Sequence, residues 1–466
     1  MDGSFSETPV PDAAEIASRY RYREDLNLLF NSRTGQYHLL GNRTAQEIFH
    51  LAATGSAVEE IVDILSKRYS VAESIVRSDA VEFFGALALD RLESTDTRIH
   101  TGGIDKGRGM VLDFPLRMEI ELTSLCNWNC GFCYNVWKID PNLSDRDVRR
   151  KIRELPTKHL PFDRVKQILD ECAAKGCYIV RYSGGETLLH PDALEIFEYG
   201  GRLGLYQVLF TNGHFIDEAV AERLARSNVR CALVSLHGDR ETQNSLAGHK
   251  LAYDRATNAM RLLLHAGIDV VAEMTLVKEN VSGVLGVMKD VHSIGVRNVG
   301  VMRYVPTGKD DDKFGVPVTV NLPLMREIDE LVRTECPDLT VSWPCGQKLC
   351  TSDDDLPLSA EDPTLALRFS QLSGHCESGI IWGSVSFDGK LRNCPHSNVY
   401  FGETEDGLSQ GWARMTKAVT EAVAPRSTCA GCAVIDACKG GCHLPKFMSP
   451  ESDGMALPLL QLTRKP

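Results

Sequence analysis

The sequence predicts an α/β protein. We expect a partial (β/α)6 barrel, preceded by a small winged-helix-like α+β domain and followed by a loop-rich domain. Strand-like and helix-like segments alternate over residues 113–320, which is typical of a parallel sheet. A hairpin pattern and three helical patterns lie within residues 20–94. Eight of the fifteen cysteines lie between residues 345 and 442.

The first domain begins after residues 1–19, which are acidic, rich in small residues and predicted to form a flexible arm. Two apolar segments, Leu26–Asn31 and Gln36–Leu40, flank a turn that contains Gly35, and this pattern predicts a hairpin. Helical periodicities follow up to residue 94. Residues 95–112 are polar and glycine-rich, and we expect a linker there.

Six strands are predicted for the barrel, and ligands of such folds bind at the carboxyl ends of the strands. The predicted barrel strands are Met118–Thr123, Tyr178–Tyr182, Gln207–Phe210, Ala232–Leu236, Val270–Leu276 and Val299–Tyr304.

Three regions are expected beyond residue 320: a bridging region (321–375), a cysteine-rich domain (376–450) and a tail (451–466).

Composition restricts the class of partner and the compartment. The net charge of −12, from 51 basic and 63 acidic residues, argues against nucleic acid as a partner. No apolar run approaches the ~20 residues of a membrane-spanning helix. The N-terminus lacks the basic start and apolar stretch of a signal peptide, so a cytoplasmic protein is expected. Fifteen cysteines in the cytoplasm indicate metal or redox sites in preference to disulfides.

Three cysteines, Cys126, Cys130 and Cys133, lie directly after the first barrel strand. Their spacing lets one loop supply three thiolates to a 4Fe–4S cluster, which leaves one iron without a protein ligand. That iron can bind the amino and carboxylate groups of S-adenosylmethionine (SAM). A structural zinc site would need four ligands, and no fourth Cys or His lies nearby.

This Cys-x3-Cys-x2-Cys pattern, with Phe132 before its last cysteine, resembles the signature of the radical SAM superfamily. The resemblance implies reductive cleavage of SAM to a 5′-deoxyadenosyl radical that abstracts a substrate hydrogen. Ser183 precedes Gly184, Gly185 and Glu186 after the second strand, and these three resemble the family motif that binds the SAM amino group.

Two further positions are assigned to SAM by the same resemblance. Ser235, at the end of the fourth strand, resembles the residue that binds the SAM ribose. Many relatives hold the SAM carboxylate with an arginine about a dozen residues later, where this chain has Ala247 before Gly248. Arg303 is the candidate replacement, and a purely structural role for Arg303 is the alternative.

The C-terminal cysteines resemble a SPASM domain, which carries auxiliary clusters in peptide-modifying radical SAM enzymes; a zinc ribbon is the alternative. The resemblance implies two auxiliary 4Fe–4S clusters, hence three in all. The inner cluster would be held by Cys376, Cys394 and Cys442, and the outer cluster by Cys429, Cys432 and Cys438.

This chain departs from the SPASM pattern because no cysteine follows Cys442. Cys345 and Cys350 bring the number of candidate ligands to eight. One of them would complete the inner cluster. The fourth ligand of the outer cluster stays open between the other of these cysteines, Asp436, His443 or no protein residue.

Residues 20–94 resemble a RiPP recognition element, the unit that binds the leader of a ribosomally made, modified peptide. Such a leader adds as a strand to an exposed sheet edge; a structural winged helix is the alternative. The expected partners are a precursor peptide with a leader and an electron donor such as flavodoxin or ferredoxin.

The resulting hypothesis is a radical SAM maturase that forms a thioether crosslink in its precursor peptide. An auxiliary iron without a protein thiolate would bind the peptide's cysteine and favour its thiolate form. Carbon–carbon crosslinking is the first alternative. Action on a partner protein or a small molecule is the second.

Overall fold

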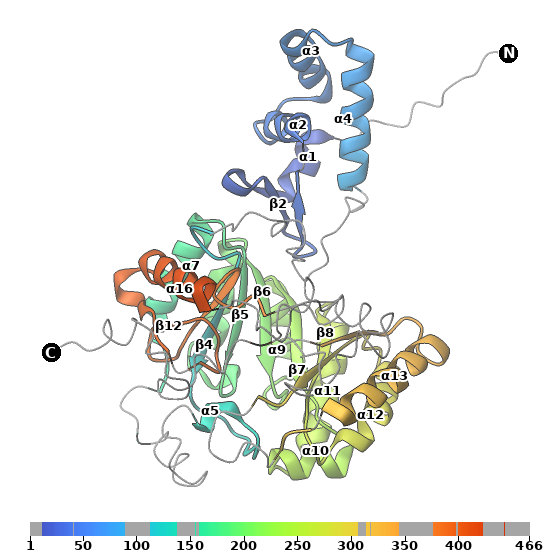
Figure 1. Cartoon of the computed structure of the whole chain (residues 1–466), viewed down its shortest axis with the longest axis vertical. Coiled ribbons are helices and arrows are strands. Elements are labelled where there is room, and N and C mark those ends of the chain that lie inside the picture. The colour runs from blue at the N-terminus through green and yellow to red at the C-terminus, as the bar shows by residue number, and fades with distance from the viewer. Residues whose placement is uncertain are drawn as a thin grey trace. The chain divides into compact units, whose positions relative to one another are not determined.

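The computed structural model describes residues 12–40, 42–88, 112–137, 154, 158–305, 314–316, 318–343, 376–397, 399–422 and 442. The chain divides into two compact units, Met1–Met110 and Val111–Pro466, and each is described by itself (Figure 1). Among the residues described, no helix has both the length and the apolar character needed to cross a bilayer.

The N-terminal unit combines a three-stranded antiparallel sheet, of order β1-β2-β3, with four helices in its described part. The predicted hairpin and the three helices after it are present. The strand β1 was not predicted, and β1 and β3 form the two edges of the sheet. The elements are α1 (Ala13–Ser18), β1 (Tyr20–Arg23), β2 (Leu28–Asn31), β3 (Tyr37–Leu39), α2 (Arg43–Ala53), α3 (Val58–Tyr69) and α4 (Glu73–Ala88).

The arm expected for residues 1–19 is too long at its C-terminal end, because α1 belongs to the folded unit. Ala13, Ile16 and Ala17 are buried in one core with α2, α3 and α4. The hydroxyl of Tyr20 donates to the carbonyl oxygen of Leu87 at 2.9 Å, which ties the chain after α1 to the end of α4. The spacing of these apolar residues is that of one helix face.

The second unit is built on a sheet of order β10-β9-β8-β7-β6-β5-β4-β11-β12-β13. The run from β4 to β9 is parallel, and these are the six predicted barrel strands. The strands are β4 (Arg117–Thr123), β5 (Ile179–Gly184), β6 (Tyr206–Thr211), β7 (Val229–Ser235), β8 (Asp269–Leu276), β9 (Asn298–Arg303), β10 (Thr340–Ser342), β11 (Trp382–Val385), β12 (Lys390–Arg392) and β13 (Gly402–Glu403).

Helices alternate with these strands, as the sequence predicts for βα units (Figure 1). Parallel neighbours need such crossover connections, and the helices cover the apolar side of the sheet. Their bounds are α7 (Phe162–Ala174), α8 (Ala193–Arg202), α9 (Glu218–Arg226), α10 (Arg240–Ala247), α11 (Ala252–His265), α12 (Val284–Ile294), α13 (Val318–Thr334) and α16 (Leu408–Ala422).

C-terminal strands extend the barrel sheet, which the sequence did not predict. Strand β11 pairs in parallel with β4, in a register that sets Ser384 opposite Glu119. Strands β12 and β13 continue the sheet in antiparallel order. Figure 1 shows β4 in the same region as β12 and α16, although they are far apart in the chain. The indole nitrogen of Trp412 in α16 donates to the carbonyl oxygen of Leu112 at 2.6 Å.

Candidate active site

The loop of Cys126, Cys130 and Cys133 begins where β4 ends, at the carboxyl edge of the sheet. Cys126 is exposed and the other two cysteines are half-buried. The backbone N–H of Trp128 donates to Sγ of Cys126 at 3.4 Å. The backbone N–H of Asn129 donates to the carbonyl oxygen of Ala247 at 2.8 Å, which holds the loop against the end of α10.

A 4Fe–4S cluster fits this loop by the chemistry of its donors. Asn212 directs its side-chain nitrogen at Sγ of Cys126 from 3.9 Å, in addition to the Trp128 N–H. N–H donors around a cysteine sulfur favour its thiolate, the form that binds iron. Among the described residues, no three Cys, His, Asp or Glu side chains converge as ligands of one ion would. The thiolates of a cubane bind separate irons, so they need no such convergence.

The turn after β5 packs directly on the chain that leads into the cysteine loop. Gly184 has a φ of +133°, and a Cβ there would lie 2.3 Å from the carbonyl oxygen of Thr123. A Cβ on Gly185 would lie 2.0 Å from the carbonyl oxygen of Leu125. Only glycine fits at both positions. The glycines were predicted to let the backbone approach SAM; the close approach that this structure contains is to the backbone before Cys126.

The Glu186 carboxylate lies at the centre of this turn and is buried. Its oxygens accept hydrogen bonds from the hydroxyl of Thr211 at 2.8 Å, the backbone N–H of Asn212 at 2.7 Å and that of Leu188 at 3.2 Å. Burial raises the pKa of Glu186 to about 7, although these bonds lower it. A carboxylate has about four acceptor positions. Three of them are therefore used by groups of the protein itself.

Phe132 of the cysteine loop is buried beside the ends of β7 and β8. Its ring contacts the ring of His237 edge-on at 4.9 Å and packs on Val277 and Phe314. Ser235 and Arg303 are half-buried at the carboxyl ends of β7 and β9. The structure therefore places the predicted SAM residues at the carboxyl ends of β5, β7 and β9.

Two polar residues at this edge, Asn212 and His237, were not predicted. Asn212 also donates to the side-chain oxygen of Asn127 at 2.8 Å. His237 is buried, its Nδ1 accepts from the backbone N–H of Thr275 at 3.1 Å, and burial lowers its pKa to about 4. The imidazole is therefore neutral with its proton on Nε2. The only sequence signal was their position, because Asn212 follows β6 directly and His237 lies two residues after the end of β7.

The C-terminal cysteines are only partly within the described residues. The thiols of Cys376 and Cys442 hydrogen-bond each other, and this bond, with burial and nearby Cys394, raises the pKa of Cys376. The Ser378 hydroxyl lies 3.1 Å from Sγ of Cys376. The structure thus brings the three predicted inner-cluster cysteines together. Outside the described residues lie Cys345, Cys350, Cys429, Cys432 and Cys438, with Asp436 and His443.

Charged side chains fill the inner side of the sheet below the cysteine loop. Arg392 of β12 lies 3.7 Å from Glu121 of β4, and both side chains are almost fully buried. Glu119 accepts from the Ser183 hydroxyl at 2.8 Å. Burial raises the pKa of Glu273 to about 7, against the opposing effect of Arg181. These groups make this side of the sheet polar.

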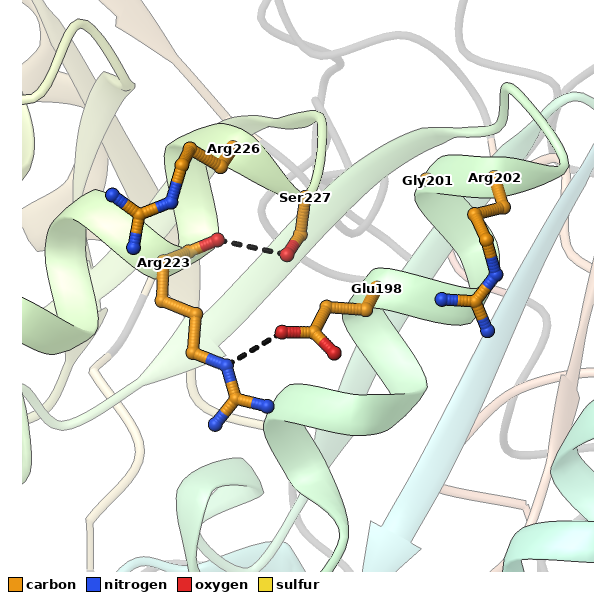
Figure 2. A pocket seen from close by; sticks show the side chains of 6 residues that line it. All are labelled: Glu198, Gly201, Arg202, Arg223, Arg226 and Ser227. Carbon is orange, nitrogen blue, oxygen red and sulfur yellow. Dashed lines mark hydrogen bonds and ion pairs between the residues drawn. The ribbon is translucent and has the colours of Figure 1, made fainter.

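A separate pocket of about 390 Å³ lies between α8 and α9 (Figure 2). Arg223 is paired there with Glu198 at 2.6 Å and with Glu195 at 2.9 Å. Arg202 and Arg226 end their helices, where a cation complements the helix dipole. These arginines therefore have structural roles, and the pocket is not formed by the carboxyl ends of the strands.

Comparison with known families agrees with this geometry. Residues 120–291 match the model of the radical SAM superfamily, and residues 27–92 match that of coenzyme PQQ synthesis protein D (PqqD). Residues 120–291 are therefore a radical SAM domain, and residues 27–92 are a PqqD domain that precedes it in the sequence, where a recognition element was predicted.

Three relatives illustrate the range of similar proteins. An AdoMet-dependent heme synthase of Methanosarcina barkeri is 30% identical over 42% of this chain and 53% of its own length. The mycofactocin maturase MftC of Mycolicibacterium smegmatis is 26% identical over 72% of this chain and 80% of its own. Streptococcus suis SuiB, in a crystal structure with its precursor peptide SuiA, shares the fold with a TM-score of 0.62, at 17% identity over 91% of this chain and 94% of SuiB.

Proposed function

We propose that this protein is a maturase that modifies a ribosomally made precursor peptide by abstraction of a hydrogen atom. The observation that carries the proposal is the PqqD domain at residues 27–92, in the same chain as the radical SAM domain at residues 120–291. A leader-binding unit joined to a radical-generating barrel brings the peptide to the barrel at a high effective concentration. MftC is named a maturase, and SuiB binds a precursor peptide, which supports this reading.

A small-molecule substrate is the second candidate, and the similarity to the heme synthase favours it. Coverage does not separate the two candidates, because an Fe-coproporphyrin III synthase of Methanosarcina barkeri is matched over 81% of its own length and MftC over 80%. A heme-type substrate has no leader peptide, so it gives the PqqD domain no role. The peptide proposal accounts for both domains.

Cys126, Cys130 and Cys133 would hold a 4Fe–4S cluster, and the turn of Gly184, Gly185 and Glu186 would bind the SAM amino group. When bound, cluster and SAM supply a 5′-deoxyadenosyl radical. Glu186 would accept a hydrogen bond from the ammonium group. Phe132, Ser235 and Arg303 would surround the rest of SAM, with Arg303 in place of the usual carboxylate-binding arginine.

Two auxiliary clusters complete the proposed cofactor set, and flavodoxin or ferredoxin would be the electron donor. The contact between the thiols of Cys376 and Cys442, with Cys394 nearby, supports the inner site. Cys429, Cys432 and Cys438 would hold the outer cluster. Cys345 or Cys350 would complete the inner cluster, and the fourth ligand of the outer cluster stays open. The iron content should fall when both cysteines are replaced.

The proposed product is a thioether between a cysteine of the precursor and a carbon of another residue. The deoxyadenosyl radical would remove one hydrogen atom from that carbon, the cysteine thiol would lose a proton, and an auxiliary cluster would accept the electron left over when carbon and sulfur join. Holding the peptide's sulfur and the carbon radical in one cavity would supply the proximity that this bond requires. Mass spectrometry tests the product. A thioether predicts the loss of two hydrogens and a cysteine that no longer alkylates. Loss of two hydrogens with every cysteine still free would discard the thioether and leave the carbon–carbon alternative.

The test of the whole proposal uses the full chain, reconstituted without oxygen, with the peptide of a short reading frame beside its gene. Wild type should form 5′-deoxyadenosine and a peptide of altered mass. Replacing Cys126, Cys130 and Cys133 together by Ala should abolish both while auxiliary iron stays bound. Undiminished SAM cleavage in the triple variant would contradict the radical site. SAM cleavage with an unaltered peptide would contradict the substrate assignment.

A further inference from the structure

Two aromatic residues, each next to a predicted cluster ligand, meet inside the second unit. Tyr134 follows Cys133 directly and begins the short helix α5 (Tyr134–Trp137). His396 lies two residues after Cys394. Their ring centroids are 4.2 Å apart and the ring planes are inclined by 35°. The radical-cluster loop and the auxiliary-cluster segment therefore touch through these two side chains.

The sheet explains why two segments so distant in sequence meet. Strand β4 leads into the cysteine loop, and β11 pairs with β4 in parallel. Strand β12 pairs with β11 and ends at Arg392, two residues before Cys394. The ion pair between Arg392 and Glu121 links the end of β12 to β4, and both side chains are buried. The contact is thus held by paired backbone on both sides.

Two groups of His396 face the sulfur of Cys394. Its backbone N–H donates to Sγ at 3.5 Å, and its ring Nδ1 lies 3.6 Å from the same sulfur. A thiolate only accepts hydrogen bonds, so with iron bound Nδ1 must be the protonated ring nitrogen. Hydrogen bonds to ligand sulfurs are among the features that set the reduction potential of an iron–sulfur cluster.

Tyr134 is positioned to keep that imidazole in place. Tyr134 is the residue after Cys133, and its ring lies against the ring of His396, which faces Sγ of Cys394. Its ring covers one side of His396, which limits the rotation that would turn Nδ1 away from Cys394.

We propose that Tyr134 and His396 are positioning residues that couple the two iron–sulfur sites. His396 donates Nδ1–H to the Cys394 thiolate and raises the potential of the auxiliary cluster, and Tyr134 holds His396 in that orientation from the radical-cluster loop. A shift of the cysteine loop would then change the hydrogen bond at Cys394. The inference rests on the proposed function in one respect, because it requires clusters at both sites.

The experiment measures iron content and the midpoint potential of each cluster in the full chain by redox titration followed by electron paramagnetic resonance. His396→Phe keeps a ring against Tyr134 but removes the Nδ1 donor, so the auxiliary potential should become more negative. Tyr134→Leu should shift it in the same direction, because the imidazole is released. Tyr134→Phe keeps the ring and should restore the wild-type potential. His292→Phe, on α12, is the control for loss of a histidine and should shift nothing.

Unchanged auxiliary potentials in both His396→Phe and Tyr134→Leu, at wild-type iron content, would overturn the inference. If His396→Phe loses auxiliary iron, Tyr134→Leu decides, since it changes neither a cysteine nor His396 itself. If Tyr134→Leu loses auxiliary iron and Tyr134→Phe keeps it, the result supports the contact between the rings of Tyr134 and His396, because Tyr134 is not a predicted ligand. A wild-type chain that binds only about four irons, enough for one cluster, would also overturn the inference. It would show that no auxiliary cluster is present, and it would leave the radical site unaffected.

Discussion

Asn212 donates its backbone N–H to the Glu186 carboxylate at 2.7 Å, so the turn after β6 holds the acidic side chain of the turn after β5. The side chain of Asn212 reaches Asn127 at 2.8 Å, in the loop after β4. One residue therefore joins the ends of three neighbouring strands. The positions of the cysteine loop and of the Glu186 turn are consequently interdependent.

Replacing Asn212 by Ala should loosen the cysteine loop while Glu186 keeps its backbone partner. The change removes the side-chain bonds to Asn127 and to Cys126, and we expect a cost of about 1–3 kcal/mol. Iron should be lost to a chelator faster than from wild type. Asn258→Ala, at an exposed position of α11, is the matched control. Equal rates of iron loss in the two variants would contradict this role.

Replacing Gly185 by Ala should be far more damaging than the same change at a glycine with open space beside it, such as Gly286. The new Cβ would lie 2.0 Å from the Leu125 carbonyl oxygen, so the chain before Cys126 must move. We expect a loss of at least about 3 kcal/mol and failure to bind the first cluster. Gly286→Ala, on the exposed side of α12, meets no atom within 4 Å and should stabilise the helix by up to about 1 kcal/mol. Denaturant titration compares the two variants.

The buried His237 should make stability depend on pH. Its pKa is about 4 in the folded chain and 6.5 when unperturbed, so between these values the unfolded chain binds a proton that the folded chain does not. The contribution of His237 to the free energy of unfolding is fully present above pH 6.5. It is lost as the pH falls toward 4, by about 3 kcal/mol in total.

His237→Asn isolates this effect, since the amide oxygen can still accept from Thr275. Glu186 and Glu273, whose pKa values are about 7, act in the opposite direction, with stability lost as the pH rises from 4.5 toward 7. Their contribution cancels in the difference between wild type and variant. A difference in unfolding free energy that stays constant from pH 7 to pH 4 would refute the assignment.

Helix α1 should be required for a stable N-terminal unit. Ile16 is 3% exposed and packs in the unit's core, so Ile16→Ala should cost about 2–5 kcal/mol. Hydrogen exchange of the β2 amides measures the effect in the full chain. Ile75→Ala, whose side chain is 55% exposed, should change the exchange little. Similar exchange in both variants would show that α1 contributes nothing.

Leader binding should occur by strand addition at β1 or β3, the edge strands of the first sheet. Proline placed in the paired part of the leader removes a backbone donor and should weaken binding, whereas alanine there should not. Calorimetry with the full chain compares the two leaders. Equal affinities would exclude backbone pairing as the binding mode.

The barrel strands were predicted because their signals are local. Residues 269–276 form β8 within one residue of the prediction, and each strand is an apolar run followed by a helical period. Helix α1 was missed because it has only six residues, too few to show a clear helical pattern. Its place in the fold becomes visible only with the contact that Tyr20, just after it, makes to the end of α4. Strands β11 to β13 were missed because their stability comes from β4, which no local pattern reveals.

The same distinction applies to the site. Cys126, Cys130 and Cys133 were found because three ligands of one type at fixed spacing form a pattern. Asn212 and His237 are single polar residues whose importance depends on what the fold brings near them. The pair of Tyr134 and His396 is of the same kind, since neither residue type nor spacing relates two such distant positions.

The pairing of β11 with β4 also determines the order in which the second unit can form. The first barrel strand leaves the ribosome early, but its neighbour on one side is residues 382–385, near the end of the chain. Until those residues are synthesised, β4 presents an open strand edge beside a loop of reduced thiols. Non-local pairing of this kind is slow and leaves a chain prone to aggregation. Completion of the sheet at the β4 edge is therefore a late event in folding.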